Sequence, residues 1–166
     1  MEIRPRRICW PTDFSELSLH GGRYALALSA QFGAELHVIH IVPPPFSPDV
    51  FLVVPAEAPV PYPEPELVAA SQEALERLVA EQFGGCDRLV IRVLTGNPWP
   101  TICRYARDDE IDLLVVTTHG RTGLSHVLIG STAERIVQHA PCPVLVVKHP
   151  AKDFLTDRAP PSQREY

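Results

Sequence analysis

Glycines and a hydroxyl residue follow an apolar run late in the chain, in an order that suits phosphate binding. The run is Leu113 to Val116, and Gly120, Gly123 and Gly130 come after it, the last directly before Ser131. We expect a helix to begin at Ser131, and the first turn of a helix offers unpaired N–H groups and a favourable dipole to an anion. Glycines also let a ligand approach the main chain. The pattern therefore predicts a phosphate-binding loop.

The same helix start has an explanation that needs no ligand. Ser131 is followed three residues later by Glu134, which is the spacing of a capping box. From the pattern alone, a phosphate-binding loop and a capped helix after a turn-rich loop are equally supported.

Strands and helices alternate along the whole chain. Near-continuous apolar strands joined by helices are typical of a parallel sheet covered on both faces, and the crossovers are right-handed. We therefore expect an α/β fold, a doubly wound, Rossmann-like, five-stranded parallel sheet with helices on both faces. The predicted strands are Arg7 to Trp10, Glu35 to Val42, Leu89 to Leu94, Leu113 to Val116 and Val144 to Val147.

Local signals set the bounds of the helices. Asp13 or Ser15 can cap the first, in which the pair Gly21 and Gly22 is a weak point, and Gly33 ends it. Pro98 or Pro100 opens a later helix whose buried face carries Ile102, Tyr105 and Ala106. The clearest helix is Glu66 to Phe83, with an apolar stripe of Leu67, Ala70, Ala74, Leu75 and Leu78.

Two loops distant in sequence are expected to form one site. Ligands of open α/β sheets bind beyond the carboxyl ends of the strands, where the strand order reverses. Pro11, Thr12 and Asp13 follow the first strand, and Thr117 to Gly120 follow the fourth. The topology rule therefore places these two segments side by side.

Composition excludes several classes of protein. The net charge is −5, whereas nucleic-acid binding needs clustered cations, so we expect no nucleic-acid partner. Arg4, Arg6 and Arg7 form the only dense basic group, interpreted as solvated flanking residues. No apolar run approaches the ~18 residues of a membrane span, and the N-terminus lacks the apolar core of a signal peptide. We expect no membrane association and a cytoplasmic location.

The cysteines and histidines give no metal site. Cysteines at 9, 86, 103 and 142 form no Cys-x-x-Cys pair, which fits reduced thiols, with Cys9 and Cys103 as small packing residues. His37 and His40 in the second strand have no metal partner at helical spacing, and we expect them at the surface or at the end of the sheet.

Two segments interrupt the pattern. Residues 43 to 65 hold nine of the chain's 18 prolines and predict an extended insertion loop, whose apolar centre from Val50 to Val54 is expected to lie on the domain or on a partner subunit. Residues 150 to 166 predict a mobile or partner-draped tail after an α/β domain of residues 1 to 149.

Three segments together resemble the universal stress protein family. They are ICWPTDFSELS, GRYALALSAQFGAELHVIHI and TTHGRTGLSHVLIGSTAERIVQHAPCPVLVV, and the resemblance covers about residues 6 to 148. Nucleotide-binding members carry Gly-x-x-Gly, nine residues, then Gly and Ser or Thr. Gly120, Gly130 and Ser131 match that motif, but Thr117 replaces its first glycine. A β-branched residue there could block a ligand, whereas a side chain pointing away would be tolerated.

The resemblance implies a fold like that of the adenine nucleotide alpha hydrolases and a site for ATP, with or without Mg²⁺. It implies ribose contact by Asp13 and adenine contact by the main chain at Ile41. The phosphates would meet Gly120, Gly130, Ser131 and Thr132. Walls and neighbours of the pocket would be Pro11, Thr12, Val116, Thr117, His119 and Ala133, with His119 shaping the loop. It also implies a homodimer through the edge strand Val144 to Lys148.

Catalysis has less support than binding. The chain has no Gly-x-x-x-x-Gly-Lys loop and no readable nucleophile with its base, so we name no catalytic residue and expect at most a slow ATPase. The first hypothesis is an ATP-binding signalling module, and the second is a nucleotide-free protein that works by dimerising. An adenylyl transferase ranks last, because Pro11 to Leu19 offers no histidine-rich or lysine-bearing activation loop.

Overall fold

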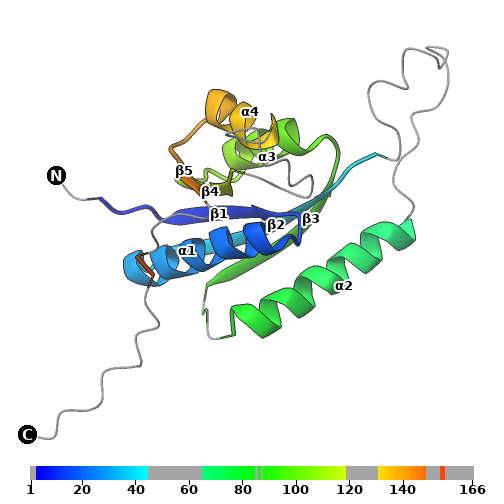
Figure 1. Ribbon diagram of the computed structural model, residues 1–166, viewed down its shortest axis with the longest axis horizontal. Coiled ribbons are helices and arrows are strands. Elements are labelled where there is room, and N and C mark those ends of the chain that lie inside the picture. The colour runs from blue at the N-terminus through cyan, green and yellow to red at the C-terminus, as the bar shows by residue number, and fades with distance from the viewer. Residues whose placement is uncertain are drawn as a thin grey trace, which may run out of the picture.

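The protein is a five-stranded sheet with helices on both faces. The structure is a computed structural model that describes residues 3–44, 65–84, 86, 88–118, 131–148 and 154–155. Figure 1 shows the sheet between two layers of helices, with α1 and α2 on one side and α3 and α4 on the other. The strands are β1 (Arg7–Thr12), β2 (Glu35–Val42), β3 (Leu89–Thr95), β4 (Leu113–Thr117) and β5 (Val144–Val147). The helices are α1 (Glu16–Phe32), α2 (Pro65–Gln82), α3 (Pro98–Asp108) and α4 (Ser131–His139).

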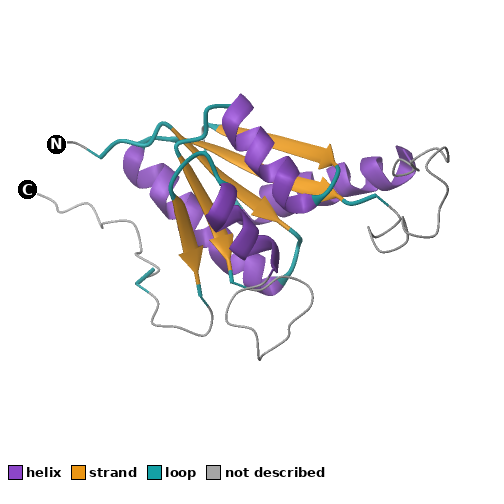
Figure 2. Cartoon of the chain, turned by 90° about the horizontal axis from the view of Figure 1, so that it is seen from above, coloured by secondary structure: helices purple, strands orange, loops and turns teal. Residues whose placement is uncertain are grey.

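All strand pairs are parallel, and the strand order is β3-β2-β1-β4-β5. The chain builds outward from β1 through β2 to β3 and then returns to the other side of β1 for β4 and β5. The order therefore reverses between β1 and β4, and their carboxyl ends flank the switch point. The strands fan out in Figure 2, as the twist of a parallel sheet requires. The predicted doubly wound α/β fold is confirmed.

Each face of the sheet has its own core. Successive side chains of a strand point to opposite faces, so Ile8 and Trp10 pack under α1 and α2, whereas Cys9 packs with Ile39 and Ile102 under α3 and α4. Burial raises the pKa of the Cys9 thiol, and it also raises the pKa of Cys103. Both thiols are buried, so their prediction as packing residues is confirmed.

Several strand and helix bounds differ from the prediction by one or two residues. We expected β1 to stop at Pro11, but it continues through Pro11, which pairs with Ile39, to Thr12. The predicted apolar stripe of α2 is only partly buried. Leu75 is fully buried, but Leu67 is 52% exposed and Ala70 is exposed too. The amino-terminal part of α2, which carries Leu67 and Ala70, extends beyond the strands (Figure 1).

The caps of α1 are resolved in favour of Ser15. Its side chain accepts a hydrogen bond from the Ser18 N–H, and Gly33 ends the helix in a left-handed conformation with φ of 63°. The weak point at Gly21 and Gly22 has a packing reason. A Cβ on Gly22 would lie 2.7 Å from the buried ring of Trp10, whose Nε1 donates to the Ser18 carbonyl at 3.1 Å.

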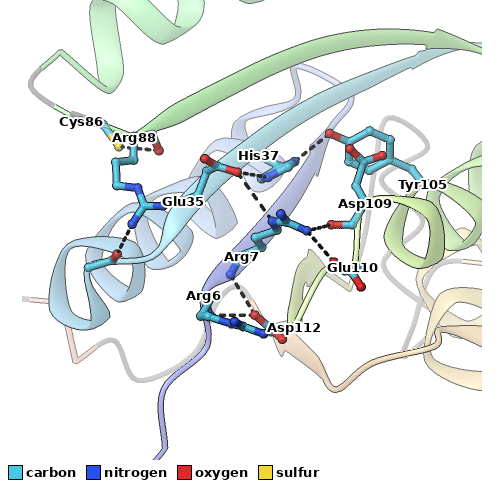
Figure 3. A network of polar contacts seen from close by, with 11 residues as sticks. Arg6, Arg7, Glu35, His37, Cys86, Arg88, Tyr105, Asp109, Glu110 and Asp112 are labelled. Carbon is cyan, nitrogen blue, oxygen red and sulfur yellow. Dashed lines mark hydrogen bonds and ion pairs between the residues drawn. The ribbon is translucent and has the colours of Figure 1, made fainter.

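A polar network ties the amino ends of β1 and β2 to α3 (Figure 3). We define the amino-end network as Arg7, Glu35, His37, Tyr105 and Glu110. His37 is only 3% exposed, so its predicted surface position is wrong. Its ring is buried because both nitrogens have partners, the Tyr105 hydroxyl at 2.7 Å and a Glu35 carboxylate oxygen at 3.0 Å.

Arg7 was expected to be a solvated flanking residue, and its side chain is 41% exposed, but the prediction missed its partners. Its Nη1 donates to the Asp109 carbonyl at 2.9 Å and lies 3.2 Å from a Glu110 carboxylate oxygen, and its Nε lies 3.8 Å from Glu35. Nearby, Asp112 accepts from the backbone N–H groups of Arg6 and Arg7 at 2.7 and 3.0 Å. These contacts fix the start of β1 against the turn after α3.

Other predictions concern residues outside the described part. They include most of the insertion loop and nearly all of the tail. Of the tail only Phe154 and Leu155 are described, and the Phe154 ring lies 4.9 Å from that of Tyr24 on α1. None of the helices in the described part of the chain combines the length and apolar character needed to cross a bilayer.

Candidate nucleotide-binding site

A cavity of about 310 Å³ opens at the switch point of the sheet. We call it the carboxyl-end cavity, because the ends of β1, β2 and β4 and the first turn of α4 enclose it. The lining combines two kinds of group. Hydroxyl and carboxylate groups come from Thr12, Asp13, Ser18, Thr118, Ser131 and Thr132, and apolar side chains come from Ile41, Pro43, Pro98, Ile102, Val116 and Ile136. The apolar side chains suit a ring system, and the polar groups suit a polar, charged group.

The turn after β1 is held by its own side chains. The Phe14 N–H donates to the Thr12 hydroxyl at 3.1 Å, and the Ser18 hydroxyl lies 3.1 Å from the same oxygen. Asp13 Oδ1 accepts from both the N–H and the hydroxyl of Ser15, at 3.0 and 2.6 Å. Asp13 therefore does not cap α1 itself but orients the residue that does. The bonds also fix the carboxylate at the cavity wall.

Phe14 adopts a conformation that a bulky residue rarely takes, with φ of 65°. The ring of His40 packs against it, with the centroids 4.4 Å apart. Backbone strain of this kind persists only where surrounding contacts hold it, and it often marks functional sites. Here it turns the chain sharply between Asp13 and the first residue of α1.

His40 belongs to the cavity. Of its two predicted places, the end of the sheet is confirmed, because it lies near the carboxyl end of β2, and the surface is wrong, because it is only 8% exposed. Its Nδ1 lies 2.7 Å from the Thr12 carbonyl oxygen, and because a carbonyl can only accept, Nδ1 carries the proton. The imidazole therefore ties β2 to the turn that carries Asp13. An alternating apolar strand gives no signal for such a role.

Helix α4 faces the cavity with its amino-terminal end. It begins at Ser131, as predicted, and Ser131, Thr132 and Ala133 all line the cavity. Four N–H groups at the start of a helix have no partner within it, so this end can receive an anion. Its first turn also carries an acidic residue, Glu134, whose side chain accepts from Gln138 at 3.4 Å.

The structure brings nine of the twelve predicted site residues to this one cavity. From β1 and the turn after it come Pro11, Thr12 and Asp13, from β2 comes Ile41, from β4 come Val116 and Thr117, and from α4 come Ser131, Thr132 and Ala133. The other three, His119, Gly120 and Gly130, lie outside the described residues. In the described residues, Pro11 to Asp13 lie beside Thr117 and Thr118, as the topology rule predicts.

Sequence reasoning missed several lining residues. Pro98 follows β3, and the rule that parallel strands end at a common edge could have identified it. Ile102 was predicted only as part of the buried face of its helix, and Ile136 was not singled out, but both line the cavity. Ser18 had no signal, since it reaches the site through its bond to Thr12.

An adenine nucleotide fits the chemistry of these walls. The cavity lies at the lower end of the roughly 300 to 1,000 Å³ that small-molecule sites occupy. The apolar side chains can pack against a base, Asp13 can accept hydrogen bonds from sugar hydroxyls, and the hydroxyls and N–H groups of α4 can donate to phosphate. Among the described residues, no group of three His, Cys, Asp or Glu side chains could hold a metal ion.

Comparison with known proteins identifies the family. The model of the universal stress protein family matches residues 5–148. The chain belongs to the universal stress protein family. Universal stress protein MJ0531 of Methanocaldococcus jannaschii is 37% identical over 150 residues, which cover 89% of this chain and 85% of that relative.

Solved structures of universal stress proteins share the fold. The chain is similar to the universal stress protein UspA from Lactobacillus plantarum, with a TM-score of 0.68 and 26% identity over 88% of this chain and 99% of the other. It also shares its fold with a universal stress protein solved in complex with cAMP, with a TM-score of 0.64 and 20% identity over 87% and 98% of the two chains.

Proposed function

We propose that this universal stress protein is an ATP-binding module that acts in stress response or signalling, as a homodimer. The observation that carries the proposal is the carboxyl-end cavity, whose lining combines apolar side chains with hydroxyls, a fixed carboxylate and a helix amino terminus. The apolar side chains match the base, the carboxylate matches the ribose hydroxyls, and the hydroxyls and N–H groups at the start of α4 match the phosphates. A relative of the same fold has been solved with cAMP, which shares the base and the sugar with ATP.

Under this proposal each group of lining residues binds a different part of the nucleotide. Ile41 offers its main chain to adenine, with Ile102 and Val116 as apolar neighbours of the ring. Asp13 accepts from the ribose hydroxyls with its carboxylate. Ser131 and Thr132 donate to the phosphates through their hydroxyls and N–H groups, together with the loop that precedes them.

The test begins with the protein as purified. Denaturation releases any bound small molecule for mass spectrometry, and the emptied protein is then titrated with ATP, AMP and cAMP, each with and without Mg²⁺. Asp13→Asn removes one charge at the cavity. Asp108→Asn is the matched control, because it removes the same charge from an exposed position at the end of α3.

We expect ATP to bind with micromolar affinity and Asp13→Asn to weaken binding at least tenfold, about 1.4 kcal/mol. Asp108→Asn should stay within twofold of the wild type. Equal losses in the two variants would mean that only net charge matters, and the proposed role of Asp13 would be wrong. If the emptied protein binds none of the three nucleotides, the proposal as a whole is wrong.

Binding without fast chemistry is the expected mode of action. No lysine or arginine is found among the described residues that line the cavity. Rapid phosphoryl transfer needs positive charge placed on the transferring group. We therefore expect ATP turnover well below about 1 per second, and a steady-state phosphate-release assay at that rate or above would overturn this part of the proposal.

A nucleotide-free dimeric interaction protein is the second candidate, and it shares with the first a homodimer that the sheet order supports. β5 lies at an edge of the sheet, and its apolar strand needs a cover. The carbonyls of Pro143 and Val147 accept from β4, so the backbone groups of Val146 between them face the open edge. Val146→Pro should therefore convert a dimer into a monomer in analytical ultracentrifugation while β4 and β5 stay paired.

The cellular location in this proposal is the cytoplasm. All four cysteines are free thiols, which fits a reducing compartment.

A further inference from the structure

Gly21 on α1 and Thr117 at the end of β4 are fitted to each other. A Cβ built on Gly21 would lie 2.7 Å from the γ-methyl of Thr117, closer than real Cβ atoms approach a neighbour. The next atom, Nε1 of Trp10, lies at 3.8 Å, which is ordinary contact. The space left by the missing side chain of Gly21 is therefore filled by one methyl group.

The direction of the Thr117 side chain follows from its strand. Leu114 and Val116 belong to the core under α3 and α4, and Val115 belongs to the core under α1. Thr117 continues the alternation and sends its methyl toward α1, although the residue itself lines the carboxyl-end cavity. The methyl therefore points to the face of the sheet that α1 covers and away from the face that carries α4.

A side chain at position 21 would force Thr117 into another rotamer. Two of the three staggered positions on a threonine Cβ hold heavy atoms, so only one rotamer presents hydrogen to α1. That rotamer sends both the methyl and the hydroxyl away from the helix, beside the backbone that ends β4. Glycine lowers the stability of a helix interior relative to alanine. Here a glycine is needed because any side chain at position 21 would meet the γ-methyl of Thr117.

We infer that Gly21 is a positioning residue for the nucleotide site, because it makes room on α1 for the γ-methyl of Thr117 and so keeps the end of β4 open to the ligand. This inference rests on the proposed function. The contact between Gly21 and Thr117 explains how a β-branched residue can occupy position 117, where nucleotide-binding members of the universal stress protein family carry a glycine.

The experiment measures Gly21→Ala in two backgrounds, the wild type and Thr117→Ser. Serine keeps the hydroxyl but lacks the methyl, so it removes only the atom that an alanine at position 21 would meet. Gly22→Ala is the matched control, since its Cβ would meet the Trp10 ring at 2.7 to 2.9 Å and not Thr117. All proteins are compared by melting temperature and by ATP dissociation constant.

In the wild type, Gly21→Ala should lower the melting temperature and weaken ATP binding at least tenfold. In the Thr117→Ser background it should change the dissociation constant less than twofold and raise the melting temperature, because alanine favours the helix. Gly22→Ala should lower the melting temperature equally in both backgrounds.

Three results would count against the inference. Equal effects of Gly21→Ala in both backgrounds would mean that the two residues are not matched. A background-dependent melting temperature with an unchanged ATP dissociation constant would leave a packing pair without a positioning role. Failure of the wild type to bind ATP would overturn the proposed function and the positioning role with it, and the melting temperatures would still decide whether the pair is matched.

Discussion

The two ends of the sheet each contain a buried histidine, and the two histidines have different surroundings. β2 carries a histidine near each end, and both are buried. At the amino end His37 lies between Tyr105 and Glu35, in a polar network whose residues do not line the carboxyl-end cavity (Figure 3). At the carboxyl end His40 bonds to the Thr12 carbonyl and lines a cavity.

The difference shows where stability and binding are separated in this fold. The amino-end network joins its polar groups to one another, so its loss should cost stability and leave ligand affinity unchanged. The polar groups of the carboxyl-end cavity are fixed by local bonds but also face open volume. Changes there should affect affinity more than stability. Three substitutions test this contrast.

The largest effect on stability is expected from Tyr105→Phe. A carboxylate can only accept, so His37 Nε2 donates to Glu35, and His37 Nδ1 is paired with the Tyr105 hydroxyl. Removing that hydroxyl leaves a buried nitrogen without a partner. We expect the free energy of unfolding to fall by about 1 to 3 kcal/mol in urea denaturation, with ATP affinity within twofold of the wild type.

A double-mutant cycle with His37→Leu separates this bond from general loss of packing. The coupling between the two positions should exceed about 0.5 kcal/mol, as for residues in contact within one network. Additive effects, or a tenfold loss of ATP affinity in Tyr105→Phe, would contradict the separation of the two ends.

A mixed effect is expected from His40→Leu at the other end of β2. It removes the N–H that holds the Thr12 carbonyl, so stability should fall by about 0.5 to 1.5 kcal/mol. The turn that carries Asp13 should also loosen and weaken ATP binding several-fold. His40→Asn can retain a donor near Nδ1 and should recover part of both losses. Full ATP affinity in His40→Leu would show that His40 has no role in ATP binding.

The smallest effect is expected from Arg7→Ala. Its closest ion pair is exposed, since the side chain of Glu110 is 84% exposed and that of Arg7 is 41% exposed. Exposed ion pairs contribute about 0.2 to 1 kcal/mol and are screened by salt. Thermal denaturation at low and high ionic strength should show a small loss that shrinks with salt. A loss above about 2 kcal/mol would show that Arg7 is central to the amino-end network.

The fold could be predicted because it depends on patterns that the chain repeats. Apolar strands, helix starts such as Pro98 and helix ends such as Gly33 are local signals, and together they specified the five strands. The errors arose where a partner distant in sequence decided the outcome. Tyr105 and Glu35 bury His37, and Asp109 and Glu110 engage Arg7, and neither pairing is visible in the sequence.

The candidate site was predictable from two sources. Parallel strands end at one edge, so Asp13 and Thr117 could be grouped without a structure, whereas Val116 and Ser131 were assigned to the site by the family resemblance. The position of His40 depends on a bond to a main-chain carbonyl, which no pattern reports. The direction of the Thr117 methyl depends on the glycine of another element.

The most direct test of the separation between the two ends is hydrogen–deuterium exchange of the emptied protein with and without saturating ATP. We expect protection in peptides that cover residues 11–18, 40–43, 116–118 and 131–136, and no change in residues 35–38 and 105–112. Protection confined to the amino end, or no protection at a concentration that saturates binding, would contradict the assignment of the carboxyl-end cavity as the nucleotide site.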